Sequence, residues 1–164
     1  MNAIVAVDRN WAIGRDGSLL FSLPSDMRRF RALTTGGTVL MGRKTLESLP
    51  GKKPLPNRRN IVLTSGTLRT KGIEIVHTLG DLRAAVANDS EDQVFVIGGG
   101  SVYRLLLPCC KRVYLTRVDA AADSPDTWFP NLDELPGWDV EHTGDLITEN
   151  GISYRFIDYI NRAV

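Results

Sequence analysis

Short apolar runs that lack polar alternation recur along most of this chain, and they restrict the possible folds more than any other feature. Runs such as NAIVAV, TVLMG and NIVLT are typical of strands buried on both faces, as in the middle of a parallel sheet. Segments with helical spacing of apolar residues separate these runs, which predicts alternating strands and helices. The predicted strands are 2–8, 38–42, 59–65, 73–77, 93–97 and 112–118, and the predicted helices are 24–35, 43–49, 79–87 and 101–107.

The pattern changes after Pro130, where two longer strands are predicted over 138–147 and 152–161. They are joined through Asn150-Gly151, and an Asn-Gly pair between two strands is the strongest short-range signal for a β-hairpin. At 164 residues the chain has the length of one domain, covering 1–164. We therefore expect a single α/β domain, with a mostly parallel central sheet flanked by helices and a C-terminal antiparallel hairpin.

Composition argues against several classes of protein. The formal net charge of +1 does not suit a nucleic-acid binder that relies on bulk positive charge. No apolar run approaches the roughly 18 residues of a membrane-spanning helix. The only cysteines, Cys109 and Cys110, are adjacent, and His77 lies far from His142, so no metal-ligand spacing is present. The N-terminal MNAIVAVDRN is too short and too early charged for a signal peptide, so we expect a cytoplasmic protein without a metal.

One carboxylate within the predicted helix 24–35 needs an explanation. On a helical wheel Asp26 falls between Phe30 and Leu33, and so on the apolar face. Met27 borders the same face. An acidic residue in the first turn also complements the helix dipole, which is the simpler explanation, but a dipole cap could face water. Burying an ionised carboxylate is unfavourable without a partner, so Asp26 is a candidate functional group.

The connection 9–22, which precedes this helix, is long and has no clear period. An ordinary solvated loop would not need its five large apolar residues. These are Trp11, Ile13, Leu19, Leu20 and Phe21. We expect a mobile flap over a site, with its last apolar residues closing over Asp26.

Small and polar residues follow three of the predicted strands, at the edge where open α/β sheets bind ligands. Arg43 and Lys44 begin a predicted helix, where cations oppose the helix dipole unless an anion is bound. Thr64 and Ser65 supply hydroxyl groups, and the glycines 98–100 permit close approach of a phosphate. Each feature alone is also explained by solvated side chains or tight turns, and GGGSVY lacks the GxGxxG fingerprint. Together they predict a polyanionic ligand the size of a dinucleotide.

Two further features concern anions. In NADP sites an arginine accommodates the 2′-phosphate, so Arg43, Lys44 and Ser65 favour the phosphorylated dinucleotide. Arg58, which follows the proline-rich segment 50–57, is a candidate for binding a carboxylate through two parallel hydrogen bonds. A solvated arginine on an edge strand is the alternative explanation for Arg58.

Seven motifs, spread in order over essentially the whole chain, resemble those of bacterial-type dihydrofolate reductases. They are AVDRNWAIG, LPSDMRRF, VLMGRKTLES, LPNRRNIVLTS, FVIGGGSVY, YLTRVD and DTWFP. The resemblance implies a dihydrofolate reductase-like fold and the reduction of 7,8-dihydrofolate to 5,6,7,8-tetrahydrofolate by hydride transfer from NADPH, in support of one-carbon metabolism and nucleotide synthesis. It also implies a monomer that binds antifolate inhibitors.

The resemblance also implies roles for individual residues. Asp26 matches the acidic residue that hydrogen-bonds the pterin ring, and Thr116 matches the hydroxyl that supports it. Leu20 and Phe21 stand beside them in the implied catalytic group, and Arg58 matches the arginine that holds the glutamate tail. The substrate-binding positions are Ile4, Val5, Asp26, Met27, Phe30, Leu49, Arg58, Ile97 and Thr116. The cofactor-binding positions are Ala6, Ile13, Gly14, Gly42, Arg43, Lys44, Thr45, Thr64, Ser65, Ile97, Gly98, Gly99, Gly100, Ser101, Val102 and Tyr103.

Two positions depart from the family's pattern. The family commonly has a tryptophan where this chain has Phe21, which lacks the indole N–H donor. Some relatives have an arginine where this chain has Ser101, so Arg43, Lys44 and Ser65 are expected to bind the 2′-phosphate instead. Two alternatives remain open. They are another reductase on the same fold, such as a pyrimidine reductase of the riboflavin pathway, and a non-catalytic nucleotide- or folate-binding module.

Overall fold

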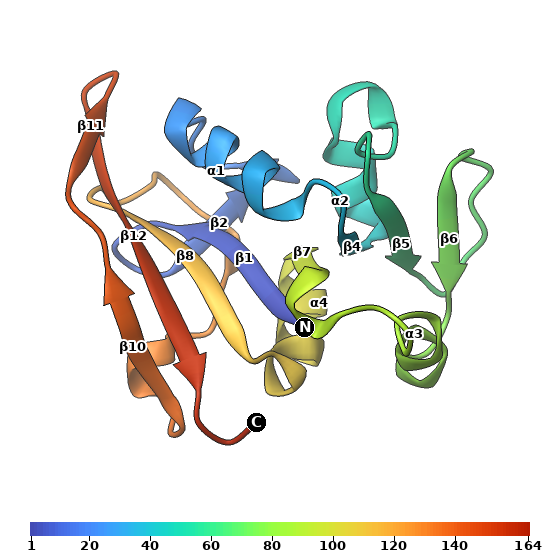
Figure 1. The fold of residues 1–164 in the computed structure, drawn as a ribbon. Helices are drawn as coiled ribbons and strands as arrows, with labels where there is room; N and C mark the ends of the chain where they lie inside the picture. The colour runs from blue at the N-terminus through green and yellow to red at the C-terminus, as the bar shows by residue number, and fades with distance from the viewer.

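The sheet that the apolar runs predict passes through the whole molecule (Figure 1). In the computed structural model, which describes all of residues 1–164, this sheet has nine strands. Their order is β10-β12-β8-β1-β7-β4-β5-β6, and β11 pairs with β12. The strands are β1 (Asn2–Val7), β4 (Thr38–Gly42), β5 (Arg59–Leu63), β6 (Ile73–Val76), β7 (Val94–Gly98), β8 (Arg112–Val118), β10 (Trp138–Thr143), β11 (Ile147–Glu149) and β12 (Ile152–Asn161).

The strands from β8 through β1, β7, β4 and β5 to β6 are parallel to their neighbours. β12 is antiparallel to β8, and β10 and β11 are antiparallel to β12. The predicted fold class is therefore confirmed. Because β7 lies between β1 and β4, the carboxyl ends of these three strands meet at one edge of the sheet, where ligands bind in open α/β folds.

Four α-helices connect the strands, and they lie where the periodicity predicts them. They are α1 (Pro24–Thr34), α2 (Arg43–Ser48), α3 (Leu79–Ala85) and α4 (Gly100–Leu106). Short 3₁₀ helices are η1 (Pro50–Lys52), η2 (Glu91–Gln93), η3 (Leu107–Cys109) and η4 (Leu132–Glu134). α1 begins at Pro24, which lacks the N–H that the first helical turn leaves unpaired.

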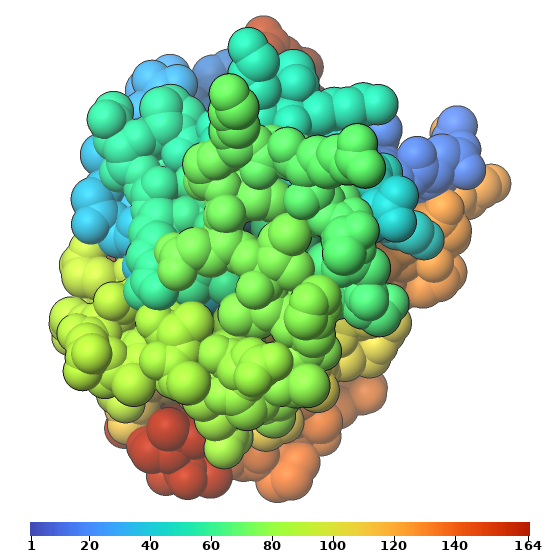
Figure 2. Space-filling view, turned by 90° about the vertical axis from the view of Figure 1, so that its right-hand side faces the viewer, coloured from blue at the N-terminus to red at the C-terminus, as the bar shows by residue number.

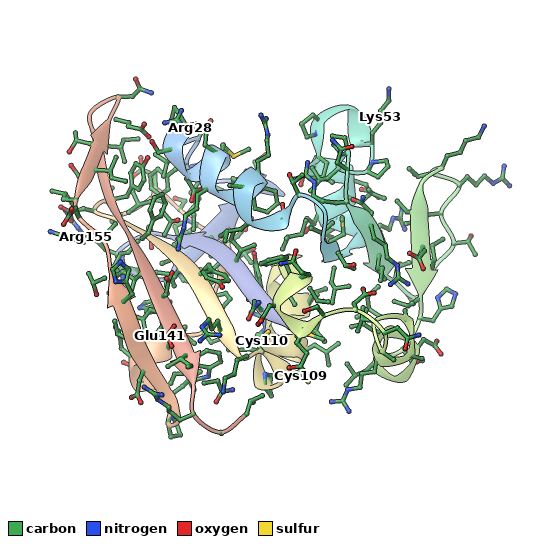
Figure 3. All side chains as sticks on the ribbon, in the orientation of Figure 1. Arg28, Lys53, Cys109, Cys110, Glu141 and Arg155 are labelled. Carbon is green, nitrogen blue, oxygen red and sulfur yellow. The ribbon has the colours of Figure 1, made fainter.

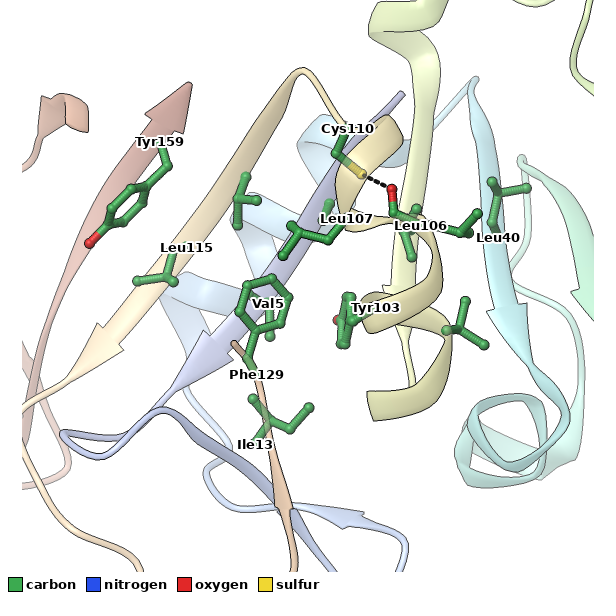
Figure 4. Close-up of a cluster of buried hydrophobic side chains, with 14 of the residues drawn as sticks. Val5, Ile13, Leu40, Tyr103, Leu106, Leu107, Cys110, Leu115, Phe129 and Tyr159 are labelled. Carbon is green, nitrogen blue, oxygen red and sulfur yellow. Dashed lines mark hydrogen bonds between the residues drawn. The ribbon is translucent and has the colours of Figure 1, made fainter. Parts of the chain in front are cut away.

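The main hydrophobic core lies on the face of the sheet that α3 and α4 cover (Figure 4). Alternate residues of β1 enter it, namely Ala3, Val5 and Val7, and α4 adds Val102, Tyr103 and Leu106. On the opposite face a smaller cluster surrounds Leu46 of α2; it contains Val39, Met41 and Val62. Alternate side chains of each strand thus point to opposite faces of the sheet. One face carries the main core, and α1 and α2 cover the other.

The connection 9–22 is more ordered than predicted. It contains β2 (Ala12–Arg15) and β3 (Ser18–Leu19), which form a small antiparallel sheet with β9 (Thr127–Trp128). The absence of a clear period did not predict these strands, and the mobile flap stays a prediction. The pairing partner β9 lies more than a hundred residues along the chain, so local periodicity carried no sign of it.

The predicted strand 138–147 is two strands. β10 ends at Thr143, and β11 begins at Ile147. A register shift between Val140 and His142 marks irregular pairing with β12. The predicted hairpin is confirmed between β11 and β12, where Asn150 and Gly151 have φ angles of 52° and 76°. These left-handed values suit the type I′ turn that Asn-Gly favours.

The two cysteines are free thiols, far from α1, on which Arg28 lies (Figure 3). Cys110 is buried, and its Sγ donates to the Leu106 carbonyl at 3.3 Å. Cys109 accepts a hydrogen bond from Arg83 at 3.3 Å. No group of three or more His, Cys, Asp or Glu side chains is arranged to hold a metal ion. None of the helices is both long enough and apolar enough to cross a membrane.

Candidate active site

Asp26 is held against β8 by a single hydroxyl group. Thr116 Oγ1 donates to Asp26 Oδ1 at 2.5 Å. Burial raises the pKa of the Asp26 carboxyl above its ordinary value, and the Thr116 hydrogen bond and the charge of Arg29 oppose that rise in part. A carboxyl in this position exchanges its proton closer to neutral pH than an exposed aspartate does. The inward orientation predicted for Asp26 is observed.

Arg29 was missed from the sequence, although it lies three residues after Asp26 and therefore on a neighbouring part of the helix surface. Its Nη2 donates to Asp158 Oδ1 at 2.6 Å, and its guanidinium carbon lies 4.3 Å from the ring centre of Phe156. Both contacts come from β12, beyond the reach of a local pattern. They hold a cation close enough to influence the pKa of Asp26.

The sheet presents apolar side chains on the face of Thr116. Ala6 pairs with Thr116 in register, and Ile4 lies two residues before Ala6 and so on the same face. Phe30, Leu49 and Ile97 are half-buried, and the last two pack against the cluster around Leu46. The side chains around the Asp26 carboxyl are therefore mostly apolar.

Phe21 packs against a third cluster, formed by Leu23, Val118 and Tyr154. It therefore lies over the end of β8, as expected for a residue that closes over Asp26, and Leu20 beside it is half-buried. Phe21 contributes apolar surface and no hydrogen-bond donor.

Two expected substrate positions lie elsewhere. Val5 pairs with Leu115, and both side chains enter the main core on the opposite face from Thr116, so only the main chain of Val5 remains near the site. Met27 is 50% exposed on the outer side of α1. The two-residue period of a strand and the register of β1 with β8 explain the first difference.

Arg58 lies at the other end of α1 from Asp26. Its Nη1 donates to Thr34 Oγ1 at 3.1 Å, and its Nε donates to the Pro56 carbonyl at 2.9 Å. Burial and the nearby charge of Arg31 lower the pKa of Arg58, which remains a cation. From Asp26 to Thr34 a helix rises by roughly 12 Å. A carboxyl and a guanidinium therefore lie near opposite ends of α1.

The turn from β7 into α4 brings three elements into close contact. Gly98 has a φ of 133°, and a Cβ there would lie 3.1 Å from Thr45 Oγ1 of α2. A Cβ at Gly100 would lie 2.6 Å from Thr127 Cγ2 of β9. Glycine is required at both positions because any side chain would meet these groups. Gly98 is buried, and Gly99 and Gly100 are half-buried at the edge of the sheet.

A cavity of about 280 Å³ lies beside this turn, between the end of β5, the β6–α3 connection and α4. It is lined by Leu63, Thr64, Ser65, His77, Thr78, Leu79, Ser101, Val102 and Leu105. The structure thus brings together four residues expected at a cofactor site: Thr64, Ser65, Ser101 and Val102. His77 and Thr78 were missed as cofactor-site residues, although His77 ends the predicted strand 73–77, Thr78 follows it, and parallel strands end at the same edge.

Several expected cofactor positions are engaged in other contacts. Arg43 Nε is 2.7 Å from Glu47 Oε1, one helical turn away, and neither Arg43 nor Lys44 lines the cavity. The Tyr103 hydroxyl donates to the Ile4 carbonyl at 2.7 Å, and its ring packs edge-on against Phe129. Burial raises the pKa of Tyr103. Tyr103 is a core residue, because α4 turns this side toward the main cluster.

The flanking segment 9–22 is tied to the β8–β9 connection by two carboxylates that were also missed. The buried Asp8 accepts N–H groups from Asn10, Ala12 and Ala122 at 2.8 to 2.9 Å. Asp126 accepts the Asp16 N–H at 2.8 Å. In this segment Ile13 is buried in the main core, and the Gly14 carbonyl accepts the Asp126 N–H at 3.0 Å. The segment therefore lies closed against its neighbour.

The fold and the site define an open α/β protein whose ligands bind outside the carboxyl ends of its strands. A sequence model of the family described as dihydrofolate reductase matches residues 1–161. The chain belongs to the dihydrofolate reductase family.

Individual relatives agree with this assignment. The dihydrofolate reductase of Mycobacterium leprae (strain TN) is 40% identical over 153 residues, covering 90% of this chain and 89% of that protein. That of Bacillus subtilis (strain 168) is 36% identical over 159 residues, covering 95% and 91%. Among solved structures, a dihydrofolate reductase from Enterococcus faecalis complexed with NADP(H) and RAB-propyl superimposes with a TM-score of 0.86 at 31% identity, covering 98% of this chain and 95% of that one.

Proposed function

We propose that this protein reduces 7,8-dihydrofolate to 5,6,7,8-tetrahydrofolate, with hydride from NADPH delivered to C6 and a proton to N5 of the pterin. The observation that carries the proposal is the Asp26 carboxyl, held by Thr116 among apolar side chains at the carboxyl edge of the sheet. No other titratable residue was expected in the pterin pocket. Family membership supports the same reaction.

The chain's residues fit NADPH. The glycines 98 and 100 let the β7–α4 turn pack closely against α2 and β9, and the cavity beside this turn offers the hydroxyls of Thr64, Ser65 and Ser101. These hydroxyls suit the phosphorylated ribose, and the β7–α4 turn suits the pyrophosphate. When bound, the nicotinamide supplies the hydride. The protein's part is to orient the two rings and to exclude water from between them.

Asp26 has two roles in this proposal. It binds the exocyclic amino group and the ring N–H of the pterin, and it favours protonation at N5 through water. Its raised pKa suits the second role, because an acid works best when it exchanges protons near the working pH. Ile4, Ala6, Phe30, Leu49 and Ile97 then form the apolar walls around the two rings.

Arg58 binds the α-carboxylate of the glutamate tail. It retains N–H groups beyond those used by Thr34 and Pro56, and it lies at the opposite end of α1 from Asp26. The p-aminobenzoyl group of the substrate would span the interval between Asp26 and Arg58.

The proposal includes three expectations about the whole protein. It acts as a monomer, it resides in the cytoplasm, and it binds antifolate inhibitors in the pterin pocket. The Enterococcus faecalis relative complexed with RAB-propyl supports the last of these. Sedimentation of the pure protein should give a mass near 18.1 kDa, and a mass of twice that value would contradict the monomer.

The deciding experiment follows absorbance at 340 nm with NADPH and dihydrofolate. We expect a steady loss that requires both compounds. Binding of NADPH without turnover would instead indicate a binding module. Turnover only with a pyrimidine intermediate of riboflavin synthesis would indicate the other reductase. Either result would overturn the proposal.

A further inference from the structure

The chemistry of the cavity beside α4 differs from that of an ordinary phosphate site. Its polar lining consists of four hydroxyls, from Thr64, Ser65, Thr78 and Ser101, and one imidazole, from His77. No lysine, arginine or carboxylate lines it. The β6 and α3 segments (green) form the outer face of the molecule on this side (Figure 2). His77 is exposed there and is the only lining residue that can acquire a charge near neutral pH.

A hydrogen bond determines which nitrogen of His77 carries hydrogen. His77 Nδ1 lies 2.7 Å from the Thr64 carbonyl oxygen. A carbonyl oxygen only accepts, so Nδ1 must donate. In the neutral ring, Nε2 is then an acceptor with a lone pair, which repels a phosphate oxygen. Only the protonated ring has a donor on both nitrogens.

We propose that His77 is a specificity-determining residue, whose protonated ring pairs with the 2′-phosphate of NADPH, so that the preference for NADPH over NADH falls as the pH rises. The inference rests on the proposed function, because it takes NADPH as the dinucleotide. The Thr64 carbonyl holds the imidazole beside the hydroxyls of Thr64 and Ser65, so protonation changes the cavity's charge without moving the ring.

The other charged groups on the surrounding elements do not reproduce this behaviour. On β6, Glu74 is bound by Arg59, and on α2, Arg43 is bound by Glu47. The remaining ones are Lys44 on α2, Arg69 and Lys71 before β6, Asp81 and Arg83 on α3, and Arg104 on α4. None of them lines the cavity. The cations among them are the same in the wild type and in variants at position 77, so the attraction they supply cancels when these proteins are compared.

The test measures dissociation constants for NADPH and NADH from pH 6 to pH 9, by quenching of tryptophan fluorescence, in the wild type and two variants. In the wild type we expect the NADPH preference to fall about tenfold over this range. His77→Gln removes the charge, so its preference should already be low at pH 6. His77→Lys carries a permanent charge, so its preference should persist to pH 9. Because His77 is exposed, both variants should fold, which circular dichroism would verify.

The phosphate group itself also titrates near pH 6, and His77→Gln reports that contribution alone. A wild-type profile that coincides with that of His77→Gln would overturn the inference while leaving the proposed function intact. Loss of the preference at pH 9 in His77→Lys would also overturn it. Failure of the wild type to bind either dinucleotide would overturn the proposed function and the inference together.

Discussion

Burial of the Asp26 carboxyl destabilises the folded protein, and the same burial gives the carboxyl a pKa that suits catalysis. The carboxyl is taken out of water, and the hydroxyl of Thr116 compensates for that loss only in part, so its pKa stays raised. Groups with such shifts concentrate at functional sites, because the same burial that destabilises the charge makes the proton available. Two consequences can be measured separately.

The first consequence is kinetic. Asp26→Asn keeps an oxygen that can accept from Thr116 but loses the carboxylate, so kcat/KM at pH 7 should fall on the order of 100-fold. Activity should recover as the pH is lowered, because acid from solution then replaces the missing group. Thr116→Ser retains the hydroxyl and is the matched control, with near wild-type rates. Wild-type turnover by Asp26→Asn at pH 7 would exclude the proposed role.

The second consequence is thermodynamic. A carboxyl whose pKa is raised on folding binds its proton more tightly in the folded state, so its contribution to stability falls as the pH rises through that pKa. Asp26→Asn should therefore raise the free energy of unfolding at pH 7 by about 0.5–2 kcal/mol. Urea denaturation measures this change, and the midpoint should move to a higher urea concentration. The difference should shrink as the pH falls below about 3, where aspartate is protonated in both the folded and the unfolded state. A less stable variant at pH 7 would contradict this account.

Arg58 acts on binding rather than on chemistry. Arg58→Lys keeps the charge but loses the planar pair of donors, so KM for dihydrofolate should rise about 10-fold with kcat unchanged. A pterin substrate without the glutamate tail should show no difference between the two proteins, and KM for NADPH should not change. Equal effects on tailed and tailless substrates would show that Arg58 does not contact the tail.

Among the elements, α1 depends on a distant hairpin for its first turn. Its N-cap residue, Leu23, has no side-chain hydrogen bond. Glu149, next to the β11–β12 turn, accepts from the Ser25 N–H at 3.0 Å and from Ser25 Oγ at 2.6 Å, and it also accepts from the Tyr154 hydroxyl. The carboxylate therefore supplies the cap that the helix lacks, one residue before Asp26.

The capping can be tested through its pH dependence. The hydrogen bonds from Ser25 and Tyr154 lower the pKa of Glu149 to about 2. Because this pKa is depressed, the stabilisation is fully present above the ordinary pKa of glutamate and is lost as the pH falls from about 4.5 toward 2. Glu149→Gln should lower the melting temperature by a few degrees at pH 7, with about the same effect at pH 6 and a smaller one at pH 3. Glu141→Gln on β10, which alters an ion pair with Arg112 of β8, is the control for loss of a surface charge. An equal loss in both variants would remove the case for a special role of Glu149.

At the scale of the molecule, the candidate site joins segments from most of the chain. NADPH, as proposed, would contact residues after β4, β5 and β7, and the substrate would contact α1 and β1. A ligand that binds only the folded state should stabilise the protein by about 2.7 kcal/mol at 100 times its dissociation constant. Thermal unfolding with NADPH at that excess should show this shift, and NADH at the same concentration should give a smaller one. No shift with NADPH would contradict the proposed cofactor.

Local information in the sequence was sufficient for most strands of the large sheet, the helices and the Asn150-Gly151 turn, because apolar periodicity and turn chemistry act over a few residues. The inward position of Asp26 followed from the same periodicity. The resemblance then identified the family and named residues that the structure gathers at one edge, among them Thr64, Ser65 and Ser101.

Contacts between distant segments decide which partner a side chain packs against, so the sequence alone did not predict them. The register of β1 with β8 sends Val5 into the core, and the α4 packing does the same to Tyr103. The pairing of β2 with β9 orders a segment that looked irregular, and the packing of α4 beside the β6–α3 connection forms the cavity that His77 lines. These outcomes come from long-range pairing and packing, whose free energy is spread over residues far apart in the chain, so no local pattern records them.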